Sequence, residues 1–273
     1  MRPDLWQSGL TLLSGALLLS VSSCGVVEKS PTCNLKGNGL RLAPYSGENL
    51  GDKQISLAFL KGPSHVSEEI GHYLEEHEIH ATFFVEGRKA EEEEEVLEKL
   101  VEQGHRIGSG GFSFTALKDS EEPVVEMKTA DEIISHFAYG NQFWYYGEPG
   151  SIDEDTLTQL NRAGLGKYIG PIHANTGGEH FVVDEECWRL GMSVSECTHG
   201  YFEEIVHLGH GIVPFHDEDP RTLELIEELV PELTAYGFTF VRLDQIPDLR
   251  LALTANGGTP DAVKGAEVCH DYE

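Results

Sequence analysis

Short apolar segments alternate with amphipathic helical segments over most of this chain. Residues 54–59 form the first apolar segment, and the helix predicted after it carries Val66, Ile70 and Leu74 on one face, with Ser64 as its N-cap. Further strands are predicted at residues 81–85, 106–108, 141–146, 167–172, 211–215 and 238–241. Helices are predicted near residues 96–101, 124–137, 152–163 and 222–236. Such alternation predicts parallel strands joined by crossover helices, in either an open sheet or a barrel.

Composition limits the classes of partner. The chain has 273 residues, 40% of them hydrophobic, which is enough for one large domain or two small ones. Its formal net charge of −28 argues against nucleic acids and anionic membrane surfaces, because both require clustered Lys and Arg. We therefore expect no nucleic-acid partner.

The first residues have the pattern of an export signal. An apolar stretch over residues 10–21 is too short for a confident membrane span and ends in Val21-Ser22-Ser23-Cys24, which resembles the processing site of bacterial lipoproteins. The alternative is an ordinary signal peptide cut nearby. We expect residues 1–23 to be a signal peptide, Cys24 to carry lipid, and residues 24–51 to form a tether. Gly25 after the cysteine favours the outer membrane of the cell envelope.

Four cysteines follow Cys24, namely Cys33, Cys187, Cys197 and Cys269. An even number in an exported protein suggests disulfides, with three possible connectivities. We favour Cys187–Cys197 as a local bridge and Cys33–Cys269 as a bridge between the two ends. A zinc site is the rival interpretation, and no Cys-x-x-Cys spacing supports it.

Two segments carry a family resemblance. Residues 57–63 read Leu-Ala-Phe-Leu-Lys-Gly-Pro, and residues 81–85 read Ala-Thr-Phe-Phe-Val. They resemble the polysaccharide deacetylase family (NodB-homology domain, carbohydrate esterase family four), whose first strand ends in Thr-Phe-Asp-Asp-Gly-Pro and whose second reads Ala-Thr-Phe-Phe-Val. The resemblance covers roughly residues 52–250. It implies a single-domain α/β fold, a distorted (β/α) barrel, followed by a tail over residues 251–273.

The resemblance also implies a chemistry. Such deacetylases bind zinc or another divalent ion through an aspartate and two histidines, use a second aspartate as base, and protonate the leaving amine with a late histidine. In this chain Leu60 stands at the base position and Lys61 at the position of the metal-binding aspartate. Gly110 stands where the first ligand histidine belongs, and Phe114 is near the second. None of these side chains suits its role, so the family's metal cofactor is not expected here.

Other motif positions are also changed. Phe143 replaces the arginine that orients the base, and Asn175 stands where a branch of the family has an aspartate. His216, at the end of the strand predicted at 211–215, is the catalytic position that remains. His105 matches a family histidine without a metal role.

Several residues are candidates for ligand binding. The ammonium group of Lys61 could hold an anionic or carbonyl group where the metal ion stood, or it could extend into solvent. The segment Trp144-Tyr145-Tyr146-Gly147 could stack on sugar rings or fill the space of a lost metal site. Both alternatives remain open for each.

The thirteen histidines could include a replacement metal site. His207 and His210 have i, i+3 spacing, and His173, His180 and His199 lie near Glu179 in sequence. We favour ordinary surface and loop histidines, since spacing alone is poor evidence for a metal.

The sequence therefore predicts an envelope lipoprotein with a deacetylase-like barrel that lacks its metal-binding and base residues. The first functional hypothesis is a non-catalytic protein that binds cell-wall or other acetylated glycan, or has a structural role. The second is a metal-dependent deacetylase of peptidoglycan or chitin-like glycan with an atypical site. The third is an acidic protein-interaction module.

Overall fold

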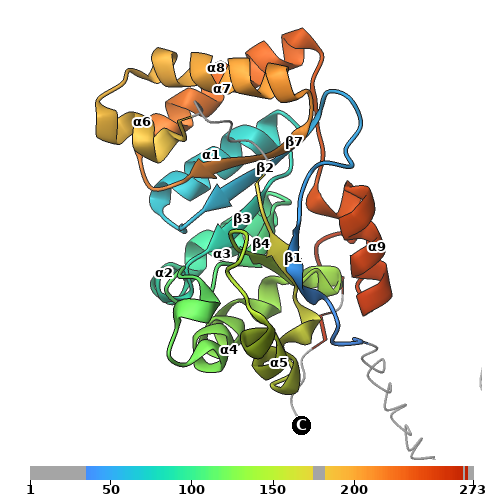
Figure 1. Ribbon diagram of the computed structural model, residues 1–273. Helices are drawn as coiled ribbons and strands as arrows, with labels where there is room; N and C mark the ends of the chain where they lie inside the picture. Colours follow the sequence, from blue (N-terminus) through green and yellow to red (C-terminus); the bar gives the residue numbers. More distant parts are fainter. Residues whose placement is uncertain (1–34, 175–181, 267, 270–273) are drawn as a thin grey trace, which may run out of the picture. The chain divides into compact units, whose positions relative to one another are not determined.

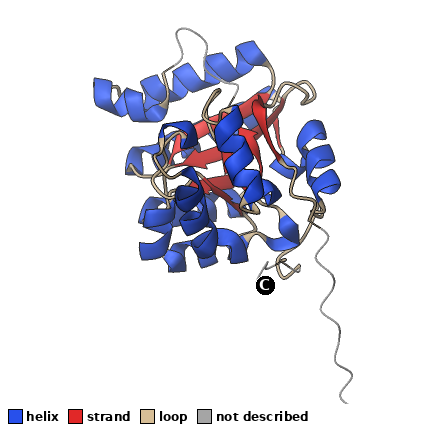
Figure 2. Ribbon diagram, turned by 60° about the horizontal axis from the view of Figure 1, so that its bottom comes forward, coloured by secondary structure: helices blue, strands red, loops and turns tan. Residues whose placement is uncertain are grey.

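A parallel β-sheet forms the centre of the computed structural model, which describes residues 35–174, 182–266 and 268–269. Among these residues the strand order is β1-β6-β5-β4-β3-β2-β7, with β8 also pairing with β2, and every pairing is parallel. Helices surround the sheet (Figures 1 and 2). The result is a half-barrel, all of it within one compact unit, Cys33–Glu273. The predicted single-domain (β/α) fold is confirmed.

The strands are β1 (Leu40–Tyr45), β2 (Gln54–Leu60), β3 (Thr82–Val85), β4 (Arg106–Ser109), β5 (Trp144–Tyr146), β6 (Ile169–Ile172), β7 (Gly211–His216) and β8 (Thr239–Phe240). The α-helices are α1 (His65–Glu76), α2 (Gly87–Glu92), α3 (Glu94–Glu102), α4 (Pro123–Ile134), α5 (Glu154–Arg162), α6 (Asp184–Leu190), α7 (Val194–Leu208), α8 (Pro220–Tyr236) and α9 (Pro247–Asn256). Each strand predicted from the sequence is present, with ends shifted by at most three residues. Among the described residues no helix is both long enough and apolar enough to cross a membrane.

Both faces of the sheet are buried. Along β2, successive side chains pack alternately into two different apolar clusters. Leu57 and Phe59 belong to the apolar cluster beneath α1, α3, α7 and α8. Ala58 and Leu60 belong to a second cluster on the other face, which α9 covers. Successive side chains of a strand point to opposite faces, so the last residue of β2, Leu60, faces the interior of the half-barrel.

Two boundaries predicted from the sequence are wrong. The tether predicted over residues 24–51 contains β1, which pairs with β6 and buries Leu40 and Tyr45. The tail predicted over residues 251–273 contains the second half of α9, whose Leu253 is buried. The predicted signal peptide (1–23), Cys24 and Cys33 lie outside the described residues.

The predicted disulfide between Cys187 and Cys197 is present and links α6 to α7. Cys269 is also disulfide-bonded. The pairing predicted for it, with Cys33, involves a residue that lies outside the described part of the chain.

The turn between β2 and α1 is fastened to the end of β7. The predicted cap is confirmed, because the hydroxyl of Ser64 accepts a hydrogen bond from the backbone N–H of Val66 at 3.1 Å. Asp217, fully buried, accepts hydrogen bonds from the N–H of Gly62 at 3.1 Å and the hydroxyl of Ser67 at 2.5 Å. Burial raises the pKa of Asp217 to about 6. This aspartate holds the turn in place without facing the interior of the half-barrel.

The buried side chain of His105, just before β4, links α1 to the segment just before β3. Its Nδ1 accepts a hydrogen bond from the N–H of Ala81 at 3.1 Å, and its Nε2 lies 2.9 Å from the carbonyl oxygen of Gly71 on α1. The ring is therefore neutral, with the proton on Nε2. Burial lowers the pKa of His105 to about 4. The role is structural.

Candidate functional site

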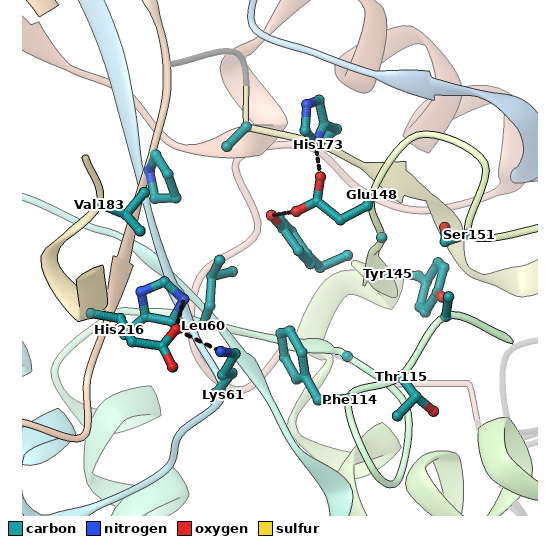
Figure 3. A pocket seen from close by; sticks show the side chains of 17 residues that line it. Leu60, Lys61, Phe114, Thr115, Tyr145, Glu148, Ser151, His173, Val183 and His216 are labelled. Atoms are coloured by element: carbon teal, nitrogen blue, oxygen red, sulfur yellow. Dashed lines mark hydrogen bonds and ion pairs between the residues drawn. The ribbon is translucent and has the colours of Figure 1, made fainter. Parts of the chain in front are cut away.

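A cavity of about 440 Å³ opens at the carboxyl ends of the strands, where parallel sheets of this kind usually bind ligands (Figure 3). The ends of β2, β5 and β7, the segments after β4 and β6, and the start of α6 all contribute to it. Its main lining residues are Leu60, Lys61, Gly110, Phe114, Tyr145, Tyr146, Gly147, Glu148, His173, Glu185 and His216.

His216 is held rigidly on one wall of the cavity. Its Nδ1 lies 2.8 Å from Oδ1 of Asp184, and its backbone N–H donates to Oδ2 of the same carboxylate at 2.8 Å. The hydroxyl of Thr222 donates to that Oδ2 as well, at 2.8 Å. Asp184 is 0% exposed. This pairing leaves Nε2 of His216 directed toward the cavity.

Lys61 lies on the same wall, in a left-handed backbone conformation with φ of 71°. Its Nζ lies 2.7 Å from Oε2 of Glu185, and Nε2 of His216 lies 3.4 Å from the same oxygen (Figure 3). The hydrogen bond from Lys61, together with the nearby His216, lowers the pKa of Glu185. The lysine therefore neither extends freely into solvent nor stands alone, because a carboxylate of the protein bridges it to the histidine.

Phe114 fills the space next to Gly110. A methyl group added at Gly110 would overlap ring atoms Cδ2 and Cε2 of Phe114. The Phe114 ring in turn stacks on Tyr146, with centroids 5.9 Å apart. No side chain can extend from position 110 while the ring stays where it is.

This overlap predicts a coupled pair of substitutions. Gly110→Ala should lower the free energy of unfolding by about 1–3 kcal/mol, because the new methyl group overpacks against Phe114. The loss should largely disappear in a Phe114→Ala background. Urea unfolding of the two single variants and the double variant measures the coupling. Gly200→Ala in α7, where nothing lies within 4 Å of the added carbon, is the control and should not destabilise. Additive losses at positions 110 and 114 would contradict the prediction.

The opposite wall carries a second polar cluster. The hydroxyl of Tyr146 donates to Oε1 of Glu148 at 2.8 Å, and Nδ1 of His173 lies 3.0 Å from Oε2. The interaction with His173, with help from Tyr146, lowers the pKa of Glu148. The cavity therefore has an aromatic and aliphatic floor between two polar walls.

Some predicted site residues meet at the cavity and others do not. Lys61, Tyr145, Tyr146 and Gly147 line it together with His216. The ligand-binding prediction for Trp144 is wrong, because its side chain is 0% exposed and packs in the core beneath the cavity.

Two further motif positions lie away from the cavity or outside the described structure. Phe143 is also buried, edge-to-face with Tyr168 at 5.6 Å. Asn175 lies outside the described residues. Asp184, Glu185 and Glu148 also belong to the site, and no sequence motif pointed to them.

The described residues do not fit a metal ion. Leu60 and Phe114 have no donor atom, Gly110 has no side chain, and the ammonium of Lys61 is paired with a carboxylate. Within residues 35–174, 182–266 and 268–269, no group of three or more His, Cys, Asp and Glu side chains could hold a metal. His173, His199, His207 and His210 belong to no such cluster among these residues, and Glu179 and His180 lie outside the described part of the chain.

Comparison with known proteins agrees with the fold. The family model for polysaccharide deacetylase matches residues 47–167. A chitooligosaccharide deacetylase of Sinorhizobium fredii is 29% identical over 46% of this chain and 60% of its own length. The crystal structure of the peptidoglycan N-acetylglucosamine deacetylase Bc1960 superposes with a TM-score of 0.60 at 21% identity, covering 75% of this chain and 92% of that one.

A second similar structure is that of BA3943 from Bacillus anthracis, a CE4 family pseudoenzyme. It has a TM-score of 0.60 at 20% identity and covers 76% of this chain and 69% of its own. A BA3943 mutant with restored enzymatic activity is similar too, with a TM-score of 0.58. The family model for polysaccharide deacetylase thus matches residues 47–167, and the chain shares its fold with solved deacetylases, so the resemblance to this family that the sequence predicts is confirmed.

Proposed function

We propose that this protein is a non-catalytic member of its family that binds an acetylated glycan. The observation that carries the proposal is the packing of Phe114 over Gly110. The family resemblance puts Gly110 at the position of the first ligand histidine and Phe114 near the second. The Phe114 ring fills the space that a metal-binding side chain at position 110 would need, which supports the loss of the metal site. The pseudoenzyme BA3943 gives a precedent for loss of activity on the same fold.

The first motif supports the same conclusion. Leu60, at the base position, offers no group that could accept a proton. Lys61, at the position of the metal-binding aspartate, presents a cation that would repel a divalent ion. His216 keeps its buried partner Asp184, but a lone histidine cannot form a coordination sphere. The cavity therefore lacks the base and the metal-binding side chains that the family's reaction requires.

The cavity itself suits a sugar. Its volume of about 440 Å³ is in the range of small-molecule sites, which are mostly apolar with a few placed polar groups. Phe114 and Tyr146, whose rings stack on each other, line the cavity with apolar surface. The polar pairs at the two walls offer hydrogen-bond partners for hydroxyl groups. Acetylated glycans are what the family acts on.

Activity and metal content test the loss of catalysis. The purified protein is incubated with zinc or cobalt, and bound metal and acetate release from chitooligosaccharides and peptidoglycan are measured. We expect no stoichiometric metal and no acetate release above the blank. Metal-dependent acetate release that disappears in His216→Ala would overturn the proposal in favour of an atypical deacetylase.

Glycan binding is measured separately, by calorimetry with chitooligosaccharides and by sedimentation with insoluble peptidoglycan. Binding that weakens in Tyr146→Ala supports the proposal. Failure to bind either glycan would favour an interaction module that uses the acidic surface.

We further propose that the protein is an envelope lipoprotein anchored through Cys24, with the outer membrane as its site. The support is the sequence pattern before that cysteine. Metabolic labelling with a radioactive fatty acid should mark the wild-type protein and not Cys24→Ser, and the variant should leave the membrane fraction. Equal labelling of the two would contradict the proposal.

A further inference from the structure

We propose that the wall formed by Lys61 and His216 binds a carboxylate group of the ligand glycan, and that Glu185 occupies this position in the free protein. The inference rests on the proposed glycan-binding function and specifies its ligand as an anionic sugar. It starts from the carboxylate already present there, whose Oε2 lies 2.7 Å from Nζ of Lys61 and 3.4 Å from Nε2 of His216.

The two groups that hold the carboxylate are fixed in place. His216 is oriented by the fully buried Asp184, which accepts from both its ring and its backbone. The backbone of Lys61 is held on both sides, because its N–H donates to the carbonyl of Phe84 at 3.1 Å and its carbonyl accepts from Lys89 at 2.8 Å. The ammonium group of Lys61 donates to this point, and so does Nε2 of His216 when the imidazole carries a proton on both nitrogens, since Nδ1 already donates to Asp184. Together they form a site for an anionic oxygen.

Of the three side chains in this cluster, Glu185 is the one that a ligand can displace. Its side chain is 57% exposed, against 35% for Lys61 and 13% for His216. An exposed ion pair of this kind contributes about 0.2–1 kcal/mol, so a ligand that supplies its own carboxylate displaces Glu185 at little expense. The glutamate can swing into solvent while the lysine and histidine stay.

The opposite wall sets the direction in which the sugar lies. Glu148 there is ionised and held by Tyr146 and His173, and its negative charge repels a second carboxylate. Hydroxyl and amide N–H groups of the sugar are suited to that wall, since a carboxylate is an acceptor. The acid group of the ligand is therefore directed to Lys61 and His216.

The size of the cavity excludes a simple anion as the natural occupant. A volume of about 440 Å³ is many times the roughly 30 Å³ that one water occupies in the liquid, and an acetate ion would leave most of it unfilled. The apolar floor formed by Leu60, Phe114 and Tyr146 also has no partner in such an ion. A sugar ring with a carboxylate substituent meets both walls and the floor.

The test compares one disaccharide in two charge states. Isothermal titration calorimetry is run with the disaccharide of N-acetylglucosamine and N-acetylmuramic acid, and with the same disaccharide as the methyl ester of its carboxyl group. We expect the free acid to bind about tenfold more tightly, as for a charge-assisted hydrogen bond. Lys61→Met should remove that preference. Glu185→Gln should tighten binding of the acid by up to about fivefold and leave the ester unchanged.

Matched variants control for general effects. Lys99→Met removes a lysine that pairs with Glu68 away from the cavity, and Glu186→Gln removes the neighbouring charge on α6, which pairs with Arg189. Both should bind the two ligands as the wild type does. Thermal unfolding establishes that each variant is folded.

The outcomes separate this inference from the proposed function. If neither disaccharide nor any chitooligosaccharide binds, glycan binding itself fails. If acid and ester bind equally and Lys61→Met changes neither, glycan binding stands and the carboxylate site is overturned. If free acetate competes as strongly as the acid disaccharide, the sugar is not recognised, and the inference also fails.

Discussion

Replacing Asp184 by alanine should lower the free energy of unfolding by about 3–5 kcal/mol. The carboxylate is fully buried and accepts hydrogen bonds from the backbone N–H of His216, its ring and the hydroxyl of Thr222. Its removal leaves these three donors, along with the hydroxyl of Tyr201 at 3.3 Å from Oδ1, without this acceptor. Urea unfolding at pH 7, followed by circular dichroism, measures the loss.

A graded set of variants identifies the cause. Asp184→Asn keeps one acceptor oxygen and should lose clearly less than the alanine variant. Glu186→Ala, two residues along α6 at a half-buried position outside this network, should change stability by less than about 0.5 kcal/mol. A loss below about 1 kcal/mol for Asp184→Ala would show that the three donors find other partners.

Acid should destabilise the protein through His105. Burial holds its folded-state pKa near 4, against a usual value of 6.5. An unfolded chain therefore binds a proton on this residue below about pH 6.5 while the folded protein does not until about pH 4. The stability is complete above pH 6.5 and falls progressively toward pH 4, by about 3 kcal/mol in total.

The measurement compares the wild type with His105→Gln across pH 4 to 7.5. The carboxylates titrate equally in the wild type and in the variant, so their contributions to stability cancel in the difference. The wild type's advantage over the variant should shrink as the pH falls through this window. Leu251→Ala, at an exposed position on α9 without a titratable group, is the control and should show a constant difference. A constant difference for His105→Gln would mean that the ring is protonated inside the folded protein.

Several of the strands that the sequence predicted have continuous apolar runs. Strands buried on both faces read as such runs, and β2, β3 and β7 follow this rule. β1 was missed because the positions between Leu40 and Tyr45 are partly or fully exposed, and a Gly- and Ser-containing segment follows. α9 was missed because it lies beyond the region of family resemblance, although its Leu249 and Leu253 are buried.

The sequence predicted only some of the residues that form the cavity. Lys61 directly follows β2, and His216 ends β7. Both strands carry motifs of the family, so the resemblance places the two residues at the same edge of the sheet. Asp184 and Glu185 start a short helix after a segment without a clear pattern, and tertiary packing alone brings them to His216. The Trp144 prediction failed because position along β5 decides whether an aromatic residue reaches the rim or stays in the core.

Asp217 fixes the shape of the β2–α1 turn independently of the side chains that line the cavity. Gly62 and Ser67 are held by a buried carboxylate next to the cavity and not by any group inside it. Substitutions at Leu60, Lys61 or Phe114 can therefore change what the cavity recognises while the turn keeps its shape. Such a scaffold is evolvable: one frame can exchange a hydrolytic centre for a recognition surface, and protein engineers could make the exchange in either direction.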